Sequence, residues 1–327
     1  MTIQAILEAI KIDDAVSPYD TLHLKIFYPA ISSDDDLAKN WGILPVDLTK
    51  APFPVVIFFN GFNCDARQYQ WLAVKLAEAG LVVILFNWIA ESLPGMINFT
   101  PGFNWQNRQP QVYGTVPTAS ALPAILTQLE KLQTASILAG TLDLQKIILG
   151  GHSEGGRLAI ENAQPNFFPQ VVASFAYAAH TGGAAILGYE IDTILPLPDS
   201  LPLLMIGGTC DGIIANGSPL FGFSTRDSIT PIIRTFQAAI TGGRCDSYLL
   251  MLDGANHFSI VDILDPTLAL PFVDFSATKP QEDFRGLLAE IITLFIDAHV
   301  RNQTESHQQL EQLLHNSHPL IRFFECK

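Results

Sequence analysis

Residues 146–160 read KIILGGHSEGGRLAI, in which an apolar run is followed by a glycine-rich turn and then by a second patterned stretch. This order predicts a β-strand, a tight turn and an α-helix. Ser153 stands at the apex of the turn, with Gly151 and Gly155 two residues to either side. Glycines there remove the side chains that would obstruct a sharp bend. We therefore predict that the Ser153 hydroxyl is exposed at the carboxyl end of a sheet strand, where it can act as a nucleophile.

Two further residues have the types and positions that such a nucleophile requires. A serine hydroxyl is weakly nucleophilic, so a histidine must accept its proton and a carboxylate must orient that histidine. Asp211 follows the apolar run 201–209, and His257 stands in the loop after the apolar run 248–252. Both are therefore expected at the carboxyl ends of strands. The order Ser153, Asp211, His257 predicts a catalytic triad.

Each partner has an alternative interpretation. Asp211 could serve only to cap the helix or turn that follows it, because Asp-Gly is a common turn pair. Asp253 and Asp246 are the rival acids, although Asp246 precedes the last strand and Asp253 shares a loop with His257. His180 follows another strand-like run and is the competing histidine.

An oxyanion-binding site requires two backbone amides that point at the developing negative charge. One is expected from the residue after the nucleophile, which is Glu154. The other is expected from the loop after an earlier strand. The apolar run 53–59 predicts that strand, and Phe62 in the following loop is the candidate donor.

Several motifs together resemble the α/β-hydrolase superfamily. They are FFNGF at 58–62, LVVI at 81–84, GHSEGG at 151–156, CDG at 210–212 and GANHF at 254–258. The likeness covers about residues 20–300, and the branch it most resembles contains chlorophyllases, platelet-activating-factor acetylhydrolases, dienelactone hydrolases and cutinase-like polyester hydrolases. Relatives usually carry His-Gly where this chain has Asn60-Gly61. The resemblance implies an α/β-hydrolase fold, with a mostly parallel central sheet, helices on both faces and loop insertions over the active site.

The function expected from these residues is that of a serine hydrolase. It would cleave a carboxylic ester with an apolar acyl or alcohol group through an acyl-enzyme, and would need no cofactor and no metal. A thioesterase, an acyltransferase or an amidase could use the same triad. A noncatalytic binding protein of the same fold is the alternative from another class.

The remaining pattern predicts secondary structure and two candidate substrate walls. Strands are expected at 3–12, 22–28, 81–87 and 171–179, and helices at 65–79, 117–132 and 282–300. The stretch 88–116, rich in Pro, Gly and Asn, is expected to be an irregular loop over Ser153. Its Phe99, Phe103 and Trp105 are candidate substrate-binding residues. The segment 212–244 is the second candidate wall.

Composition bounds the class of protein. With 327 residues, 48% hydrophobic and 15% charged, the chain 1–327 is expected to form a single domain with a sizeable core. The net charge of −14 argues against nucleic acid and anionic membrane surfaces as partners. The first residues lack the pattern of a secretory signal, and no run has the length of a transmembrane helix. A cytoplasmic protein without stable membrane insertion, acting on a small-molecule or lipid-like ester, is expected.

The four cysteines are Cys64, Cys210, Cys245 and Cys326. They are scattered and contain no CxxC pair, so they indicate neither a zinc site nor a disulfide framework. A single disulfide between Cys210 and Cys245 is the alternative.

Overall fold

The computed structural model describes residues 2–13, 15–34, 36–93 and 95–327. Its strands are β1 (Thr2–Lys11), β2 (Thr21–Ala30), β3 (Phe53–Phe59), β4 (Val82–Leu93), β5 (Met96–Phe99), β6 (Leu142–His152), β7 (Val171–Tyr177), β8 (Leu203–Gly208), β9 (Ser247–Leu252) and β10 (Ile321–Cys326). Its helices are α1 (Asp36–Trp41), α2 (Gln70–Glu78), α3 (Leu122–Ala135), α4 (Glu154–Glu161), α5 (Gly212–Gly217), α6 (Thr230–Ala239), α7 (Gln281–His299) and α8 (Thr304–His315).

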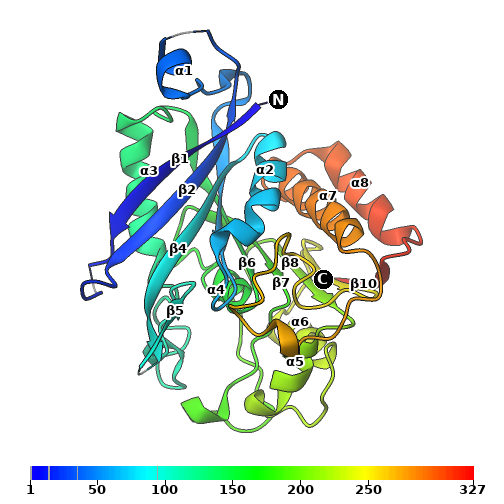
Figure 1. The fold of residues 1–327 in the computed structure, drawn as a ribbon. Helices are drawn as coiled ribbons and strands as arrows, with labels where there is room; N and C mark the ends of the chain where they lie inside the picture. The colour runs from blue at the N-terminus through cyan, green and yellow to red at the C-terminus, as the bar shows by residue number, and fades with distance from the viewer. Residues whose placement is uncertain (1, 14, 35, 94) are drawn as a thin grey trace.

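The strands of the described residues form one mixed sheet in the order β1-β2-β4-β3-β6-β7-β8-β9-β10, and β5 pairs with β4 outside this path. Neighbours from β4 to β9 are parallel. The edge strands β1, β2 and β10 join antiparallel. Because parallel neighbours need crossover connections, helices lie between most of these strands in the chain, and the protein is of the α/β class (Figure 1).

Helices cover both faces of the sheet. All seven residues of β3 are buried, and they alternate between two apolar layers. Val56 and Phe58 pack in the layer that contains α2 and α7, whereas Val55 and Ile57 pack in the layer of α3 and α4. A strand covered on both faces has no polar alternation, which is why the sequence presents it as a continuous apolar run.

The long helix α7 shows how sequence spacing produces this packing. Its apolar residues recur at three- and four-residue intervals and are fully or almost fully buried: Phe284, Leu287, Leu288, Ile291, Ile292, Phe295 and Ile296. Each such side chain contributes about 1.5–3 kcal/mol relative to exposure. Glu282 and Asp283 lie in the first turn, where the helix dipole favours negative charge. The helix predicted at 282–300 is confirmed.

Two expectations about secondary structure are wrong in part. The stretch 88–116 is not irregular throughout, because β4 continues to Leu93 and β5 pairs with it. Residues 88 and 90 are buried, whereas 89 and 91 are exposed. This alternation is typical of a half-buried strand and differs from the continuous buried run before it. Helix α3 begins at Leu122 rather than at 117, and Pro123 is the proline in its first turn.

The chain also continues into two elements that the sequence reading did not predict. Helix α8 buries Leu310 and Leu314, and β10 pairs antiparallel with β9.

All four cysteines are free, so the alternative disulfide between Cys210 and Cys245 is not formed. No helix in the described part of the chain combines the length and apolarity that a bilayer crossing requires.

Candidate active site

The predicted site residues gather at the carboxyl edge of the parallel strands. The chain passes from β3 outward to β4 and then returns to the other side of β3 as β6. Such a reversal of strand order opens a crevice beyond the strand ends, where ligands bind in open α/β sheets. Ser153 follows β6 directly, and the loop with Phe62 follows β3. The two segments therefore flank this crevice.

The turn at Ser153 has the strained geometry expected of it. Ser153 has φ 55° and ψ −122°, a conformation that non-glycine residues seldom adopt. A Cβ on Gly151 would lie 2.3 Å from the Gly155 carbonyl oxygen, and one on Gly155 would lie 2.2 Å from that of Asn60. The two glycines thus allow β6, α4 and the loop after β3 to approach one another closely.

Asp211 and His257 form a buried pair. His257 Nδ1 donates to Asp211 Oδ2 at 2.8 Å, and both side chains are buried. Asp211 Oδ1 accepts from the Ile214 amide at 2.8 Å and caps α5. Asp211 therefore has both the orienting contact and the capping contact that the sequence offered as alternatives. With the proton on Nδ1, the His257 Nε2 lone pair is left to accept another.

The charges around His257 act on its basicity. Burial opposes protonation, but the Asp211 carboxylate and, more weakly, Asp274 outweigh burial and raise the pKa of His257 above its usual 6.5. Burial and the Asp211 charge raise the pKa of Asp274 to about 6, against the opposing effect of His257. Asp274 Oδ1 accepts from the Gly212 amide at 2.7 Å, and Oδ2 from the Phe258 amide at 3.4 Å. It therefore ties together the loops that carry Asp211 and His257.

The rival residues have other partners. Asp253 pairs with Lys279 at 2.7 Å, and Asp246 pairs with Arg244 at 2.9 Å. His180 Nδ1 accepts a backbone amide at 3.1 Å. Burial, with smaller effects of nearby cations, lowers the pKa of His180 to about 3, so its ring is neutral near pH 7.

The candidate oxyanion amides belong to Phe62 and Glu154, which line one cavity together with Ser153. Within the described residues, neither amide is used in a hydrogen bond between loops, and an amide in the first turn of a helix has no partner inside that helix. Asn60 Nδ2 donates to the Phe86 carbonyl at 2.8 Å and to the Cys64 carbonyl at 3.1 Å. Asn60 thus anchors the loop after β3.

A hydrogen-bonded chain through Tyr69 and His152 joins three loops. The Gly61 amide donates to the Tyr69 hydroxyl at 3.1 Å, and this hydroxyl lies 2.8 Å from His152 Nδ1. His152 Nε2 lies 2.9 Å from the His257 backbone oxygen. Because a carbonyl only accepts, Nε2 carries the proton and Nδ1 accepts from Tyr69. His152, which the motif treats as a variable position, therefore links the loop after β3, the turn at Ser153 and the loop of His257.

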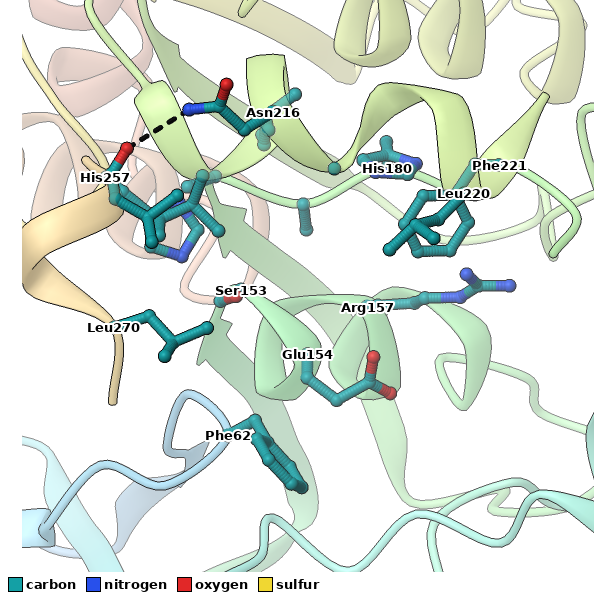
Figure 2. Close-up of a pocket in the computed structure, with 16 residues that line it drawn as sticks. Phe62, Ser153, Glu154, Arg157, His180, Asn216, Leu220, Phe221, His257 and Leu270 are labelled. Carbon is teal, nitrogen blue, oxygen red and sulfur yellow. Dashed lines mark hydrogen bonds between the residues drawn. The ribbon is translucent and has the colours of Figure 1, made fainter. Parts of the chain in front are cut away.

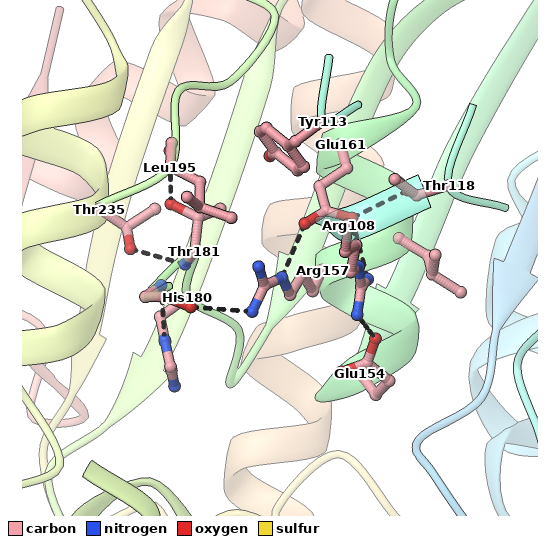
Figure 3. Close-up of polar contacts among 12 residues, drawn as sticks. Arg108, Tyr113, Thr118, Glu154, Arg157, Glu161, His180, Thr181, Leu195 and Thr235 are labelled. Atoms are coloured by element: carbon pink, nitrogen blue, oxygen red, sulfur yellow. Dashed lines mark hydrogen bonds and ion pairs between the residues drawn. The ribbon is translucent and has the colours of Figure 1, made fainter. Parts of the chain in front are cut away.

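A buried ion network lies beside α4 (Figure 3). Arg108, which is almost fully buried, pairs with Glu154 and with Glu161. Arg157 Nε donates to Glu161 at 2.7 Å, and its Nη1 donates to the Gly182 carbonyl at 3.1 Å. Two guanidinium groups thus balance two carboxylates. Buried charges require such pairing with an opposite charge. Arg108 also fixes the loop after β5 against the helix that follows Ser153.

Two apolar cavities meet at Ser153. The larger has a volume of about 400 Å³ and the smaller about 250 Å³. Residues that line both are Phe62, Ser153, Ile213, His257 and Leu270. No hydrogen bond joins the Ser153 hydroxyl to the His257 ring within the described residues. Catalytic hydrogen bonds often tighten only when substrate binds.

One wall of the larger cavity is formed by α5 and the turn after it (Figure 2). This wall belongs to the segment 212–244 and includes Leu220 and Phe221. Leu270 and Val273 come from the loop between His257 and α7, which the sequence did not single out. Asn216 Nδ2 donates to the Val273 carbonyl at 3.1 Å and so links the two walls.

The aromatic residues proposed as substrate contacts lie outside both cavities. Phe99 lines a separate pocket near Tyr19. Phe103 packs against Phe62, with ring centroids 5.9 Å apart, and Trp105 packs against Phe103 at 4.8 Å. From the stretch 88–116, the residues that reach the smaller cavity are Met96 and Asn98.

Among the residues that the structure describes, no group of three or more His, Cys, Asp or Glu side chains is placed to hold a metal ion. No protein-family model matches the sequence, and no curated protein is significantly similar to it. What the site can do chemically therefore follows from its own side chains and backbone.

Proposed function

We propose that this protein is a serine hydrolase of the α/β-hydrolase fold that cleaves carboxylic esters with an apolar acyl or alcohol group. One observation carries the proposal: Ser153, held in a strained turn, shares two cavities with His257, whose Nδ1 is bonded to the buried Asp211. The strand-turn-helix context and the chain order of the three residues support the fold assignment.

The reaction would proceed through an acyl-enzyme. The Ser153 hydroxyl attacks the ester carbonyl carbon while His257 Nε2 accepts its proton, and Asp211 stabilises the imidazolium. The amides of Phe62 and Glu154 donate to the oxyanion. The imidazolium then returns the proton to the departing alkoxide, which leaves as an alcohol. A water attacks the acyl-enzyme with His257 again as base, releasing the acid and free Ser153.

The cavities support an apolar substrate. The larger cavity is lined by apolar side chains that include Ile213, Leu220, Phe221 and Leu270. Apolar lining with a few placed polar groups is typical of small-molecule sites. Each methylene removed from water contributes about 0.8 kcal/mol, so long or aromatic groups are expected to bind better than acetyl.

The proposal is tested with a fluorophosphonate probe and a chromogenic butyrate ester. Wild-type protein is expected to gain one adduct by intact mass, located at Ser153 by peptide mapping. Ser153→Ala should lose the adduct and about 10⁴ to 10⁶ in turnover. Ser224→Ala, at an exposed serine, is the matched control and should keep both. Labelling or full turnover in Ser153→Ala would overturn the proposal.

A further inference from the structure

The larger cavity has an apolar body and a polar region. Leu220 and Phe221 belong to the apolar wall, whereas His180 and Arg157 add polar groups (Figure 2). These two side chains are more than nine-tenths buried, with 9% and 6% of their surface exposed. A polar side chain buried to this degree normally uses its hydrogen-bonding atoms, so their partners identify what the cavity can recognise.

His180 offers a donor to the cavity. Its Nδ1 accepts the Gly182 amide at 3.1 Å, so the proton of the neutral ring is on Nε2. The ring is held edge-on against Phe221, with centroids 4.6 Å apart. Within the described residues, Nε2 forms no hydrogen bond. It is also not one of the fully buried polar atoms that lack a partner. Nε2–H therefore remains available to a molecule in the cavity.

Arg157 offers a second donor beside it. Its Nε donates to Glu161 and its Nη1 to the Gly182 carbonyl, which leaves Nη2 without a hydrogen bond among the described residues. The amide of Gly182 orients His180 while its carbonyl orients Arg157. The backbone of Gly182 thus fixes both donors, on His180 and Arg157, and this favours recognition of a single acceptor group.

The charges select a neutral acceptor over a carboxylate. Arg157 is already paired with Glu161, and Arg108 with Glu154 and Glu161, so the network has no unbalanced positive charge. The Glu154 side chain itself lines the cavity. A substrate carboxylate would add a third negative charge to a balanced, desolvated network, which is unfavourable. A ketone or ester carbonyl accepts from both donors without that penalty.

We propose that the larger cavity binds the half of the ester substrate that carries a second, neutral acceptor oxygen, and that His180 Nε2–H and Arg157 Nη2–H donate to this oxygen. The preferred substrates are thus keto esters and diesters rather than esters of plain hydrocarbon chains. The inference rests on the proposed function, because it takes the occupant of the cavity to be part of an ester.

The test compares kcat/KM within two matched pairs. In the acid series these are the p-nitrophenyl esters of hexanoate and 5-oxohexanoate, and in the alcohol series hexyl acetate and 5-oxohexyl acetate. The keto compound should be preferred by about 10-fold in one series, the value of one well-formed hydrogen bond. The series that shows the preference identifies the half in the larger cavity. No preference in either series would overturn the proposal, as would faster cleavage of a matched carboxylate, mono-p-nitrophenyl adipate.

Two substitutions at His180 separate the donor from the ring's structural role. His180→Asn keeps an acceptor near Nδ1 and removes the donor at Nε2, so the keto preference should fall to about 1. His180→Gln places an amide donor near Nε2 and should restore part of it. His23→Asn, at an exposed histidine of β2, is the matched control and should keep the preference. A preference that survives His180→Asn would show that another group binds the oxygen.

Binding to Ser153→Ala separates this inference from the proposed function. In calorimetry with the same ester pairs, the dissociation constant should be about 10-fold lower for the keto member in one series. This difference should disappear in the Ser153→Ala, His180→Asn double variant. If wild-type protein cleaves none of the esters, the proposed function fails, and these dissociation constants still decide the inference. Equal constants within both pairs would overturn it.

Discussion

The proposed reactive centre, formed by Ser153, Asp211 and His257, and the walls of the larger cavity are built in different ways. Its residues follow the ends of β6, β8 and β9, and a buried hydrogen bond joins His257 to Asp211. The walls come from α5, from the turn after it and from the loop between His257 and α7, and they leave apolar side chains open to solvent. Leu220 is 71% exposed and Leu270 is 53% exposed. In the proposed hydrolase, rigid strand ends would set the chemistry, and longer connecting segments would set the substrate preference.

This contrast predicts two kinds of mutational effect. A change in the reactive centre removes interactions made in the transition state with every substrate, so it lowers kcat throughout. A change in a wall alters binding of the substrates that reach it, so it shifts the ratio of kcat/KM between long and short esters.

Of these two kinds of effect, the larger is expected at Asp211, the carboxylate that orients His257. Asp211→Asn should lower kcat on the order of 10⁴-fold, because an amide stabilises the wrong imidazole tautomer and no longer the imidazolium. Asp253→Asn is the matched control, since Asp253 pairs with Lys279 in a partly exposed contact and should change kcat little. Steady-state kinetics on one chromogenic ester decide between them. A larger loss in Asp253→Asn would reverse the assignment of the acid.

A smaller and selective effect is expected at the wall. Leu220→Ala removes apolar contact area from the larger cavity, and should lower kcat/KM for a long ester about 10-fold more than for the corresponding acetyl ester. Phe99→Ala should leave this ratio unchanged, because Phe99 lines a separate pocket near Tyr19. The measurement is the ratio of the two kcat/KM values in each variant. Should Phe99→Ala lower the ratio while Leu220→Ala does not, the stretch 88–116 would be the wall after all.

The sequence could place the candidate residues at strand ends because each signal is local. The glycines around Ser153 and the turns after two apolar runs mark positions at strand ends without any knowledge of the tertiary structure. The strands buried on both faces could also be predicted, because each appears in the sequence as a continuous apolar run. The edge strand β10 was missed because it is only half buried and mixes apolar with charged residues.

The residues that support the centre were not predictable, because they act between distant segments. Tyr69 contacts His152 across 83 positions, and Arg108 contacts Glu154 across 46. Asp274 stands in a loop without a periodic pattern or a turn motif. Nor could the sequence show that Phe103 and Trp105 stack behind Phe62 instead of lining the cavity. Contacts of this kind are determined by the packing of elements rather than by local spacing.

The smallest effect is expected in the pH dependence, where Asp274 connects the two regions because its loop also carries Leu270. His257 must be neutral to accept the Ser153 proton, so kcat/KM should rise with pH, with a midpoint above 6.5 because the pKa of His257 is raised. Asp274, with a pKa of about 6, is mostly ionised there, and its charge favours the imidazolium. Asp274→Asn removes that charge, so the pKa of His257 should fall and the midpoint should move to lower pH. Asp262→Asn, at a partly exposed partner of Arg285, should leave the midpoint in place. An unchanged or higher midpoint in Asp274→Asn would show that the loop of Leu270 belongs only to the wall and has no electrostatic part in the centre.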